Sequence, residues 1–136
     1  MRLPELQTDY WRLLSGEERH AKSPETFEIP SRTDRENLSR GSAAKLLFEI
    51  ESENERGDIE TNVERMWVIV SEKIGDTYIG ILDCQPVTIE SSEDEYLCFG
   101  AEVPFKAEHV IEIGAPPEKY AEWQLNQKPE RIWHRG

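Results

Sequence analysis

The stretch "ERMWVIVSEKIGDTYIGILDCQP", residues 64–86, is where the apolar residues of this chain gather with least interruption. Apolar side chains alternate before Gly75-Asp76 and again after it, which is the period-2 pattern of a β-strand. Gly-Asp between two β-branched runs is typical of a tight hairpin turn. Gly80 predicts a bulge or bend in the second strand, and Pro86 ends that strand because it cannot donate to a ladder. The stretch therefore predicts a β-hairpin in the core and not a reactive site.

The segments on either side of this hairpin predict further strands. In "AAKLLFEIE" (43–51), Ala44, Leu46, Phe48 and Ile50 fall on one face, which indicates a half-buried strand. The charged stretch that follows, 52–62, predicts an exposed loop.

Beyond the hairpin, residues 87–113 predict an acidic loop at 91–95 and one or two short strands. His109 to Ile113 is expected to form the last of these strands.

The two ends of the chain predict less regular structure. Residues 1–30 are expected to be a peripheral N-terminal arm, with a helix within 3–16 and an extended segment over 17–30. "SRTDRENLSRGS" (31–42) predicts a short helix capped by Thr33 and Glu36. Residues 114–136 predict a C-terminal helix and tail, with the helix starting at Pro116-Pro117 and stopping before Pro129.

Together these elements predict one domain over residues 1–136, with a β core at 31–113. The expected fold class is mainly β (α+β). It consists of a small, strongly curved antiparallel sheet, an SH3-like partial barrel with short N- and C-terminal helices. The alternative is an open α+β sheet with the terminal helices packed on one face.

The charge of the chain narrows the class of partner. The sequence has 16 Lys and Arg against 28 Asp and Glu, a formal net charge of −12. Nucleic-acid affinity comes largely from cationic neutralisation of phosphates, so a nucleic-acid partner is not expected. An anionic membrane surface is disfavoured for the same reason. An acidic surface suits a basic protein partner, such as a basic toxin that this chain would neutralise.

The cysteines and the apolar runs predict a cytoplasmic protein. Cys84 and Cys98 do not make a disulfide framework. The N-terminal segment carries Pro4, Glu5 and Asp9 where a signal peptide needs an apolar run. No run of apolar residues approaches the length of a membrane span.

Four segments carry a resemblance to a known family: "RGSAAKLLFEIE", "ERMWVIVSE", "YIGILDCQP" and "FGAEVPFKAEHVIEI". They resemble a family of short bacterial proteins known as domain of unknown function family 2314, over about residues 41–113. That family has a Gly-led "VKLxF" strand, an "ERMWV" strand, a "GxLxNxP" turn and a "VxFxxxHI" strand. Cys84 stands where the family often has Asn, and Pro104 stands where a plain strand residue is commoner. The resemblance implies a compact domain and no established biochemical activity.

Few side chains point to catalysis. Cys84 with Asp83, and His109 with Glu108, would form a nucleophile and base pair only if the fold brought them together. No cationic residue near Cys84 would lower the pKa of its thiol. The histidines are scattered and no zinc-site spacing occurs, so neither a metal nor a cofactor is expected.

Exposed aromatic side chains on a curved sheet would offer a binding groove. Trp67 and Tyr78 lie on the predicted central strands, so they join Asp83, Cys84 and His109 as candidate binding residues. The sequence therefore favours a non-catalytic, acidic interaction domain. The alternative is a small-ligand binder or hydrolase-like enzyme that uses Cys84 and His109.

Overall fold

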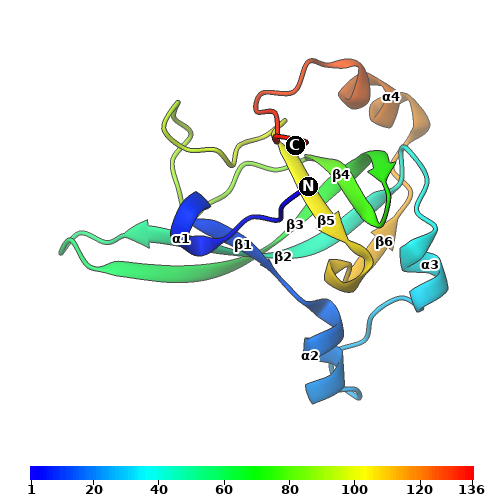
Figure 1. Ribbon diagram of the computed structural model, residues 1–136, viewed down its shortest axis with the longest axis horizontal. Coiled ribbons are helices and arrows are strands. Elements are labelled where there is room, and N and C mark those ends of the chain that lie inside the picture. The colour runs from blue at the N-terminus through cyan, green and yellow to red at the C-terminus, as the bar shows by residue number, and fades with distance from the viewer.

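The computed structural model describes residues 1–136 and shows a mainly β chain built on one curled antiparallel sheet (Figure 1). Strands β1 to β5 lie side by side in chain order, and the short β6 pairs with the start of β2. The sheet forms a half-barrel with short helices outside it, which confirms the predicted fold class. The strands are β1 (Trp11–Leu14), β2 (Ala43–Glu53), β3 (Ile59–Ile74), β4 (Thr77–Leu82), β5 (Glu102–Lys106) and β6 (Glu112–Gly114).

Residues 64–86 form the predicted hairpin at the centre of this sheet. β3 and β4 pair through a turn at Gly75, whose φ of +62° is a conformation that glycine adopts without strain. The ladder shifts by one residue at Ser71, so the bulge lies in β3, beside the residue that pairs with Gly80. A Cβ on Gly80 would lie 2.6 Å from Val68 Cγ2. The absence of a side chain at Gly80 lets Val68 and the ring of Phe105 pack directly on its backbone.

The core fills the inside of the half-barrel. Alternate residues of β2 point into it, as predicted, and Leu46 and Phe48 are completely buried. Trp11, Tyr96 and Trp133 lie where β1 and β5 leave the barrel open. The Trp11 ring centroid is 6.0 Å from that of Tyr96 and 5.8 Å from that of Trp133. Aromatic side chains, and not strand pairing, therefore seal the open side.

On the outer edge of β5, most hydrogen-bonding groups have partners and Pro104 carries no N–H. The N–H of Glu102 donates to the carbonyl of Arg131, and the Tyr96 hydroxyl donates to the carbonyl of Glu102. Pro104 has no N–H to offer, and the N–H of Lys106 donates to a ring nitrogen of His109. The sheet accommodates Pro104 because proline fits an edge strand at a position that faces away from the neighbouring strand.

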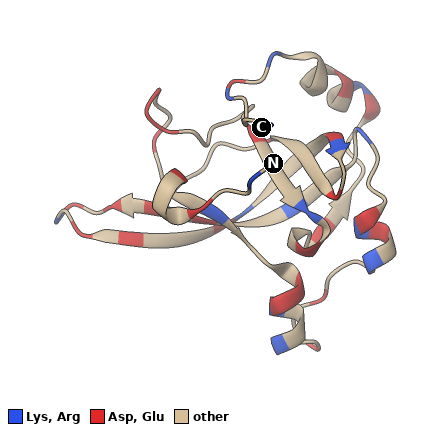
Figure 2. Ribbon diagram, viewed as in Figure 1, with Lys and Arg blue, Asp and Glu red and all other residues tan.

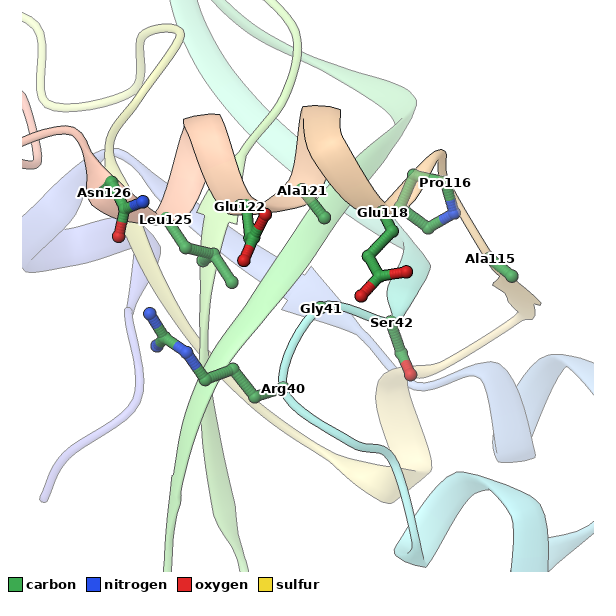
Figure 3. Close-up of a pocket in the computed structure, with 10 residues that line it drawn as sticks. All are labelled: Arg40, Gly41, Ser42, Ala115, Pro116, Glu118, Ala121, Glu122, Leu125 and Asn126. Carbon is green, nitrogen blue, oxygen red and sulfur yellow. The ribbon is translucent and has the colours of Figure 1, made fainter.

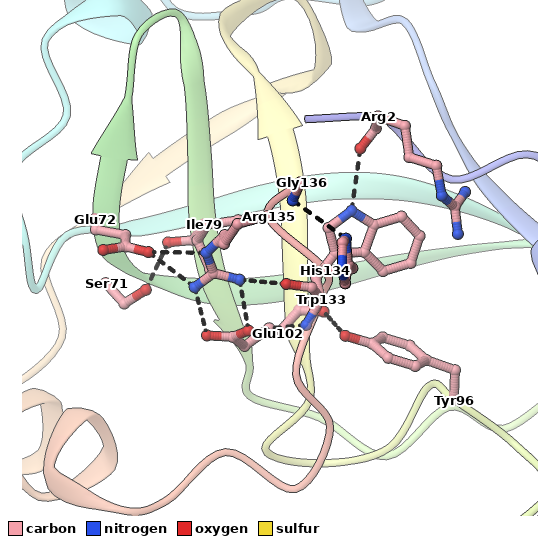
Figure 4. A network of polar contacts seen from close by, with 10 residues as sticks. All are labelled: Arg2, Ser71, Glu72, Ile79, Tyr96, Glu102, Trp133, His134, Arg135 and Gly136. Atoms are coloured by element: carbon pink, nitrogen blue, oxygen red, sulfur yellow. Dashed lines mark hydrogen bonds and ion pairs between the residues drawn. The ribbon is translucent and has the colours of Figure 1, made fainter.

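Residues 129–135, which we call the C-terminal strap, cover this edge (Figure 4). Glu102 accepts hydrogen bonds from the backbone N–H of Trp133 and from Arg135. The indole N–H of Trp133 donates to the carbonyl of Arg2, so the two ends of the chain meet at the strap. A buried carboxylate on β5 therefore holds the segment that completes the core.

The helices are short and lie outside the barrel. They are α1 (Leu6–Asp9), α2 (Gly16–Lys22), α3 (Arg32–Glu36), η1 (Ala107–His109) and α4 (Glu118–Asn126). α4 follows the predicted position. Ser31, and not Thr33, caps α3, because its hydroxyl accepts from the N–H of Asp34. No helix has the length and apolar content that a membrane crossing needs.

The N-terminal expectation is wrong in two places. The helix stops at Asp9, since Tyr10 has a φ of +67°, and Trp11–Leu14 then pairs with β2 as β1. Trp11 is only 2% exposed, so this part of the expected peripheral arm belongs to the core. The expected extended segment begins instead with α2, capped by the Ser15 hydroxyl.

Two further expectations need correction. Residues 52–62 are mostly strand and not loop: β2 and β3 continue as a two-stranded ribbon that projects from the body (Figure 1). The Asn54 side chain closes its tip by accepting from the N–H groups of Arg56 and Asp58. The strand expected at 109–113 starts later, because η1 precedes it and β6 begins at Glu112.

Candidate functional site

The structure places Asp83 and Trp67 next to each other at the end of β4. The N–H of Asp83 donates to the carbonyl of Trp67 at 3.0 Å. The Asp83 carboxylate accepts from the Tyr120 hydroxyl at 2.6 Å and from the Gln124 amide at 3.0 Å. The bond to Asp83, helped by burial, raises the pKa of Tyr120 to about 12. Asp83 therefore fastens α4 to the sheet through one oxygen of its carboxylate, Oδ1.

Trp67 and Tyr78 do not line a common groove. Trp67 is half-buried, and the ammonium of Lys45 lies 5.0 Å from its ring centroid. Tyr78 is completely buried and stacks on Phe105. The Tyr78 hydroxyl donates to the carbonyl of Arg35 at 2.9 Å, so it holds the end of α3 onto the core.

Cys84 and His109 lie at opposite ends of β4. Cys84 lies two residues beyond the end of that strand, whereas His109 belongs to the turn after Lys106, which pairs with the first residue, Thr77. Five residue steps of a strand span roughly 16 Å. This is far beyond the reach of a nucleophile and base pair.

The surroundings of these two side chains also keep both of them unreactive. Burial, followed by the charges of Glu64 and Asp83, raises the pKa of the Cys84 thiol. His109 is buried; its Nδ1 accepts from Lys106, and its Nε2 lies 3.3 Å from Glu108. Burial, together with the charge of Lys106, lowers the pKa of His109 to about 4, so the ring is neutral near pH 7. Neither group is activated.

Metal ligands do not gather anywhere in the molecule, since no three His, Cys, Asp or Glu side chains are grouped so that they could hold an ion. The hollows of the surface therefore offer the better candidate site. Two of them meet at Ser42, one beside α4 and one beside α3 and β6.

The first hollow, which we call the α4 cleft, lies between α4 and the segment Arg40–Ser42 and has a volume of about 490 Å³ (Figure 3). The backbone fixes this segment: the N–H of Gly41 donates to the carbonyl of Val70, and the N–H of Val70 donates to that of Ser42. A Cβ on Gly41 would lie 4.0 Å from Ala121 Cβ, so α4 passes close over the segment. Both walls of the cleft are thus held by the sheet.

Two carboxylates, Glu118 and Glu122, hang from α4 into this cleft one helical turn apart (Figure 3). Neither forms an ion pair with a protein cation. Arg40 also lines the cleft, but its guanidinium donates to the carbonyl of Ser71 at 2.8 Å. Like charges at this spacing destabilise a helix by about 0.2–0.5 kcal/mol. A cation placed between the two carboxylates would remove that repulsion.

The second hollow, which we call the α3–β6 groove, is wider, with a volume of about 750 Å³. Its apolar lining comes from Ile29, Leu38, Ile111 and Ile113, and its charged lining comes only from carboxylates. None of the residues that line the groove or the cleft is among the candidate binding residues that the sequence predicted. The signal that could have found the cleft is the pair of acids at i and i+4 in the predicted C-terminal helix.

Figure 2 shows that acidic residues are spread over the chain and are also frequent on the β2–β3 ribbon. The cleft and the groove differ from the ribbon because they are concave and have apolar walls. Comparisons with protein-family models, with curated proteins and with solved structures gave no match. The support for the α4 cleft and the α3–β6 groove as a candidate site is therefore their geometry alone.

Proposed function

We propose that this chain is a non-catalytic binding domain that docks a basic protein partner, with a lysine or arginine side chain in the α4 cleft. One observation carries the proposal: the charged residues that line the cleft and the adjoining groove are five acids and a single arginine. They are Glu28, Asp34, Glu112, Glu118, Glu122 and Arg40. Glu112 alone among the acids pairs with a cation, Lys45, at 3.3 Å.

The shape of the cleft supports a long basic side chain. Leu125, Ala121 and Pro116 give it apolar walls, and the two free carboxylates stand beside them. Lysine and arginine can pack their aliphatic stem on apolar walls while their charged group remains in a polar environment, which matches this arrangement. The net charge of −12 would also speed the encounter with a basic partner.

The hydrolase-like alternative loses its geometric support, because Cys84 and His109 lie at opposite ends of β4. A small-ligand role has no buried polar group to argue from in either hollow. The interaction domain is therefore the proposal to test first.

The test is a titration of the chain with a lysine-rich peptide, compared with a peptide in which glutamates replace the lysines. We expect binding of the lysine-rich peptide alone, weakening as salt rises because the charges are screened. Glu118→Gln with Glu122→Gln should weaken binding about tenfold. A matched control, Glu93→Gln with Asp94→Asn, makes the same change of net charge on an exposed loop.

The control separates a local site from general attraction. We expect the loop variant to bind within about twofold of the unchanged chain. Equal losses in the two double variants would reject the cleft, and no binding at low salt would reject the proposal altogether.

We also propose a cytoplasmic location and membership of the family that residues 41–113 resemble. Free thiols at Cys84 and Cys98 support a reducing compartment. Thiol labelling directly after lysis should count both cysteines, and a disulfide would contradict the location. A family member with a different strand order would contradict the membership.

A further inference from the structure

The α3–β6 groove has a feature that a purely ionic site does not need, which is an apolar floor. Leu38 and Ile113 are partly buried against the core, Ile111 is 7% exposed, and Ile29 is half-buried beside them. These side chains come from three separate parts of the chain, yet they line one hollow. When a partner covers apolar surface in a concave site, the burial of that surface stabilises the complex.

The rim of the groove limits what can cover that floor. Its charged residues are Glu28, Asp34 and Glu112, with no lysine or arginine among the lining residues. A second copy of this chain would bring the same carboxylates against one another, and like charges that meet at an interface oppose binding. The rim therefore favours a partner that combines apolar and basic side chains.

We propose that the α3–β6 groove binds a bulky aliphatic side chain of the same partner segment whose basic side chain enters the α4 cleft. The two hollows share Ser42 as a lining residue, so one segment can reach both. This inference rests on the proposed function and adds the class of partner: a segment with an aliphatic anchor next to basic residues. The aliphatic anchor supplies affinity that salt does not screen, and the basic residue supplies selectivity.

The test compares two peptides that differ in one side chain. One has a leucine followed by lysines in a glycine-serine background, and the other has serine in place of the leucine. We expect the leucine peptide to bind about tenfold more tightly, the effect of burying much of one leucine side chain. This difference in affinity between the two peptides (the gap) should remain when salt is raised, although both peptides then bind more weakly.

Variants locate the anchor. Ile29→Ser should reduce the difference in affinity between the two peptides to about twofold or less, because it removes part of the apolar floor. Ile29 lies outside the strands, so the sheet itself is not altered. Ile59→Ser is the matched control: Ile59 is 62% exposed on the β2–β3 ribbon, and its loss should leave the gap unchanged. Ile29→Ala, with a thermal melt of each variant, separates a lost contact from a lost fold. In amide NMR spectra, the leucine peptide should shift the signals of Leu38 and Ile113 more than the serine peptide does.

The outcomes separate this inference from the proposed function. If both peptides bind equally and Glu118→Gln with Glu122→Gln still weakens them, the groove anchor is rejected and the basic-partner site stands. If Ile29→Ser and Ile59→Ser reduce the gap equally, the groove is again rejected as its location. If neither peptide binds at low salt, both proposals fail.

Discussion

Replacing Arg135 by alanine removes the cation that holds the C-terminal strap on β5. Its guanidinium donates to the two carboxylate oxygens of Glu102 at 2.8 and 2.9 Å, and to Glu72 at 2.8 Å (Figure 4). Glu102 is 6% exposed. In Arg135→Ala this buried carboxylate would keep only the N–H of Trp133 as a partner, at 2.9 Å.

The expected cost lies between two limits. Removing one partner of a buried ion pair costs about 3–5 kcal/mol, whereas a surface pair is worth about 0–1 kcal/mol. The Glu102 side chain is 8% exposed and that of Arg135 is 37% exposed, so this pair is buried on one side only. We therefore expect Arg135→Ala to lower the free energy of unfolding by about 2 kcal/mol at neutral pH.

The pH dependence gives the prediction a second readout. Burial alone would raise the pKa of Glu102, but the bonds from Arg135 and Trp133 outweigh it and lower the pKa below its ordinary value of 4.5. A carboxylate with a lowered pKa in the folded state stabilises the fold above its ordinary pKa. That contribution is lost as the pH falls through the folded value. The difference between the unchanged chain and Arg135→Ala should therefore shrink as the pH falls below 4.5 and the carboxylate takes up a proton.

Urea unfolding followed by tryptophan fluorescence, at neutral pH and at about pH 3, measures both effects. Arg32→Ala is the control, because the side chains of Arg32 and Glu36 are 78% and 46% exposed and their ion pair should contribute little to stability. Equal losses in the two variants would show that the strap is not held by Glu102. A loss from Arg135→Ala that does not change with pH would show that the guanidinium acts through packing and not through charge.

Three other variants test separate parts of the structure. Gly80→Ala places a methyl group 2.6 Å from a valine side chain of β3, so urea unfolding should show a loss of about 1–3 kcal/mol. The pKa of His109 falls to about 4 on folding, so the unfolded chain takes up a proton at a higher pH than the folded chain. The free energy of unfolding should therefore fall by about 3 kcal/mol as the pH drops from 6.5 toward 4. His109→Gln keeps an acceptor for the Lys106 N–H and should flatten that slope, and an unchanged slope would contradict the assignment. Absorbance titration should give Tyr120 a pKa of about 12, and Asp83→Asn should return it toward 10.

Sequence patterns predicted the centre of this fold because the signals there are local. The alternation in β2 and the turn at Gly75 are each set by neighbouring residues. The patterns failed at β1, where Leu6, Tyr10, Leu13 and Leu14 lie near helical spacing. The strand forms because Trp11 packs on Trp133, far along the chain, and no local pattern records that contact.

The same limit applies to the candidate site. Asp83 and Trp67 were named from the sequence and do lie together, but Asp83 fastens α4 and the two residues do not form a groove. The α4 cleft depends on Gly41 passing under α4, which joins segments about eighty residues apart. Residues of one helix can be recognised from their spacing, whereas the surface that they face cannot.

The closed outer edge of β5 restricts how other molecules can join this sheet. Strand addition needs a run of free N–H and C=O groups, and Pro104 together with the strap leaves no such run on β5. Strand pairing at the edge of β5, whether in a fibril or with the backbone of a partner, would first require the C-terminal strap to detach. A partner that approaches β5 must then be recognised by its side chains, so its amino-acid sequence, and not merely an extended shape, is the basis of selection there.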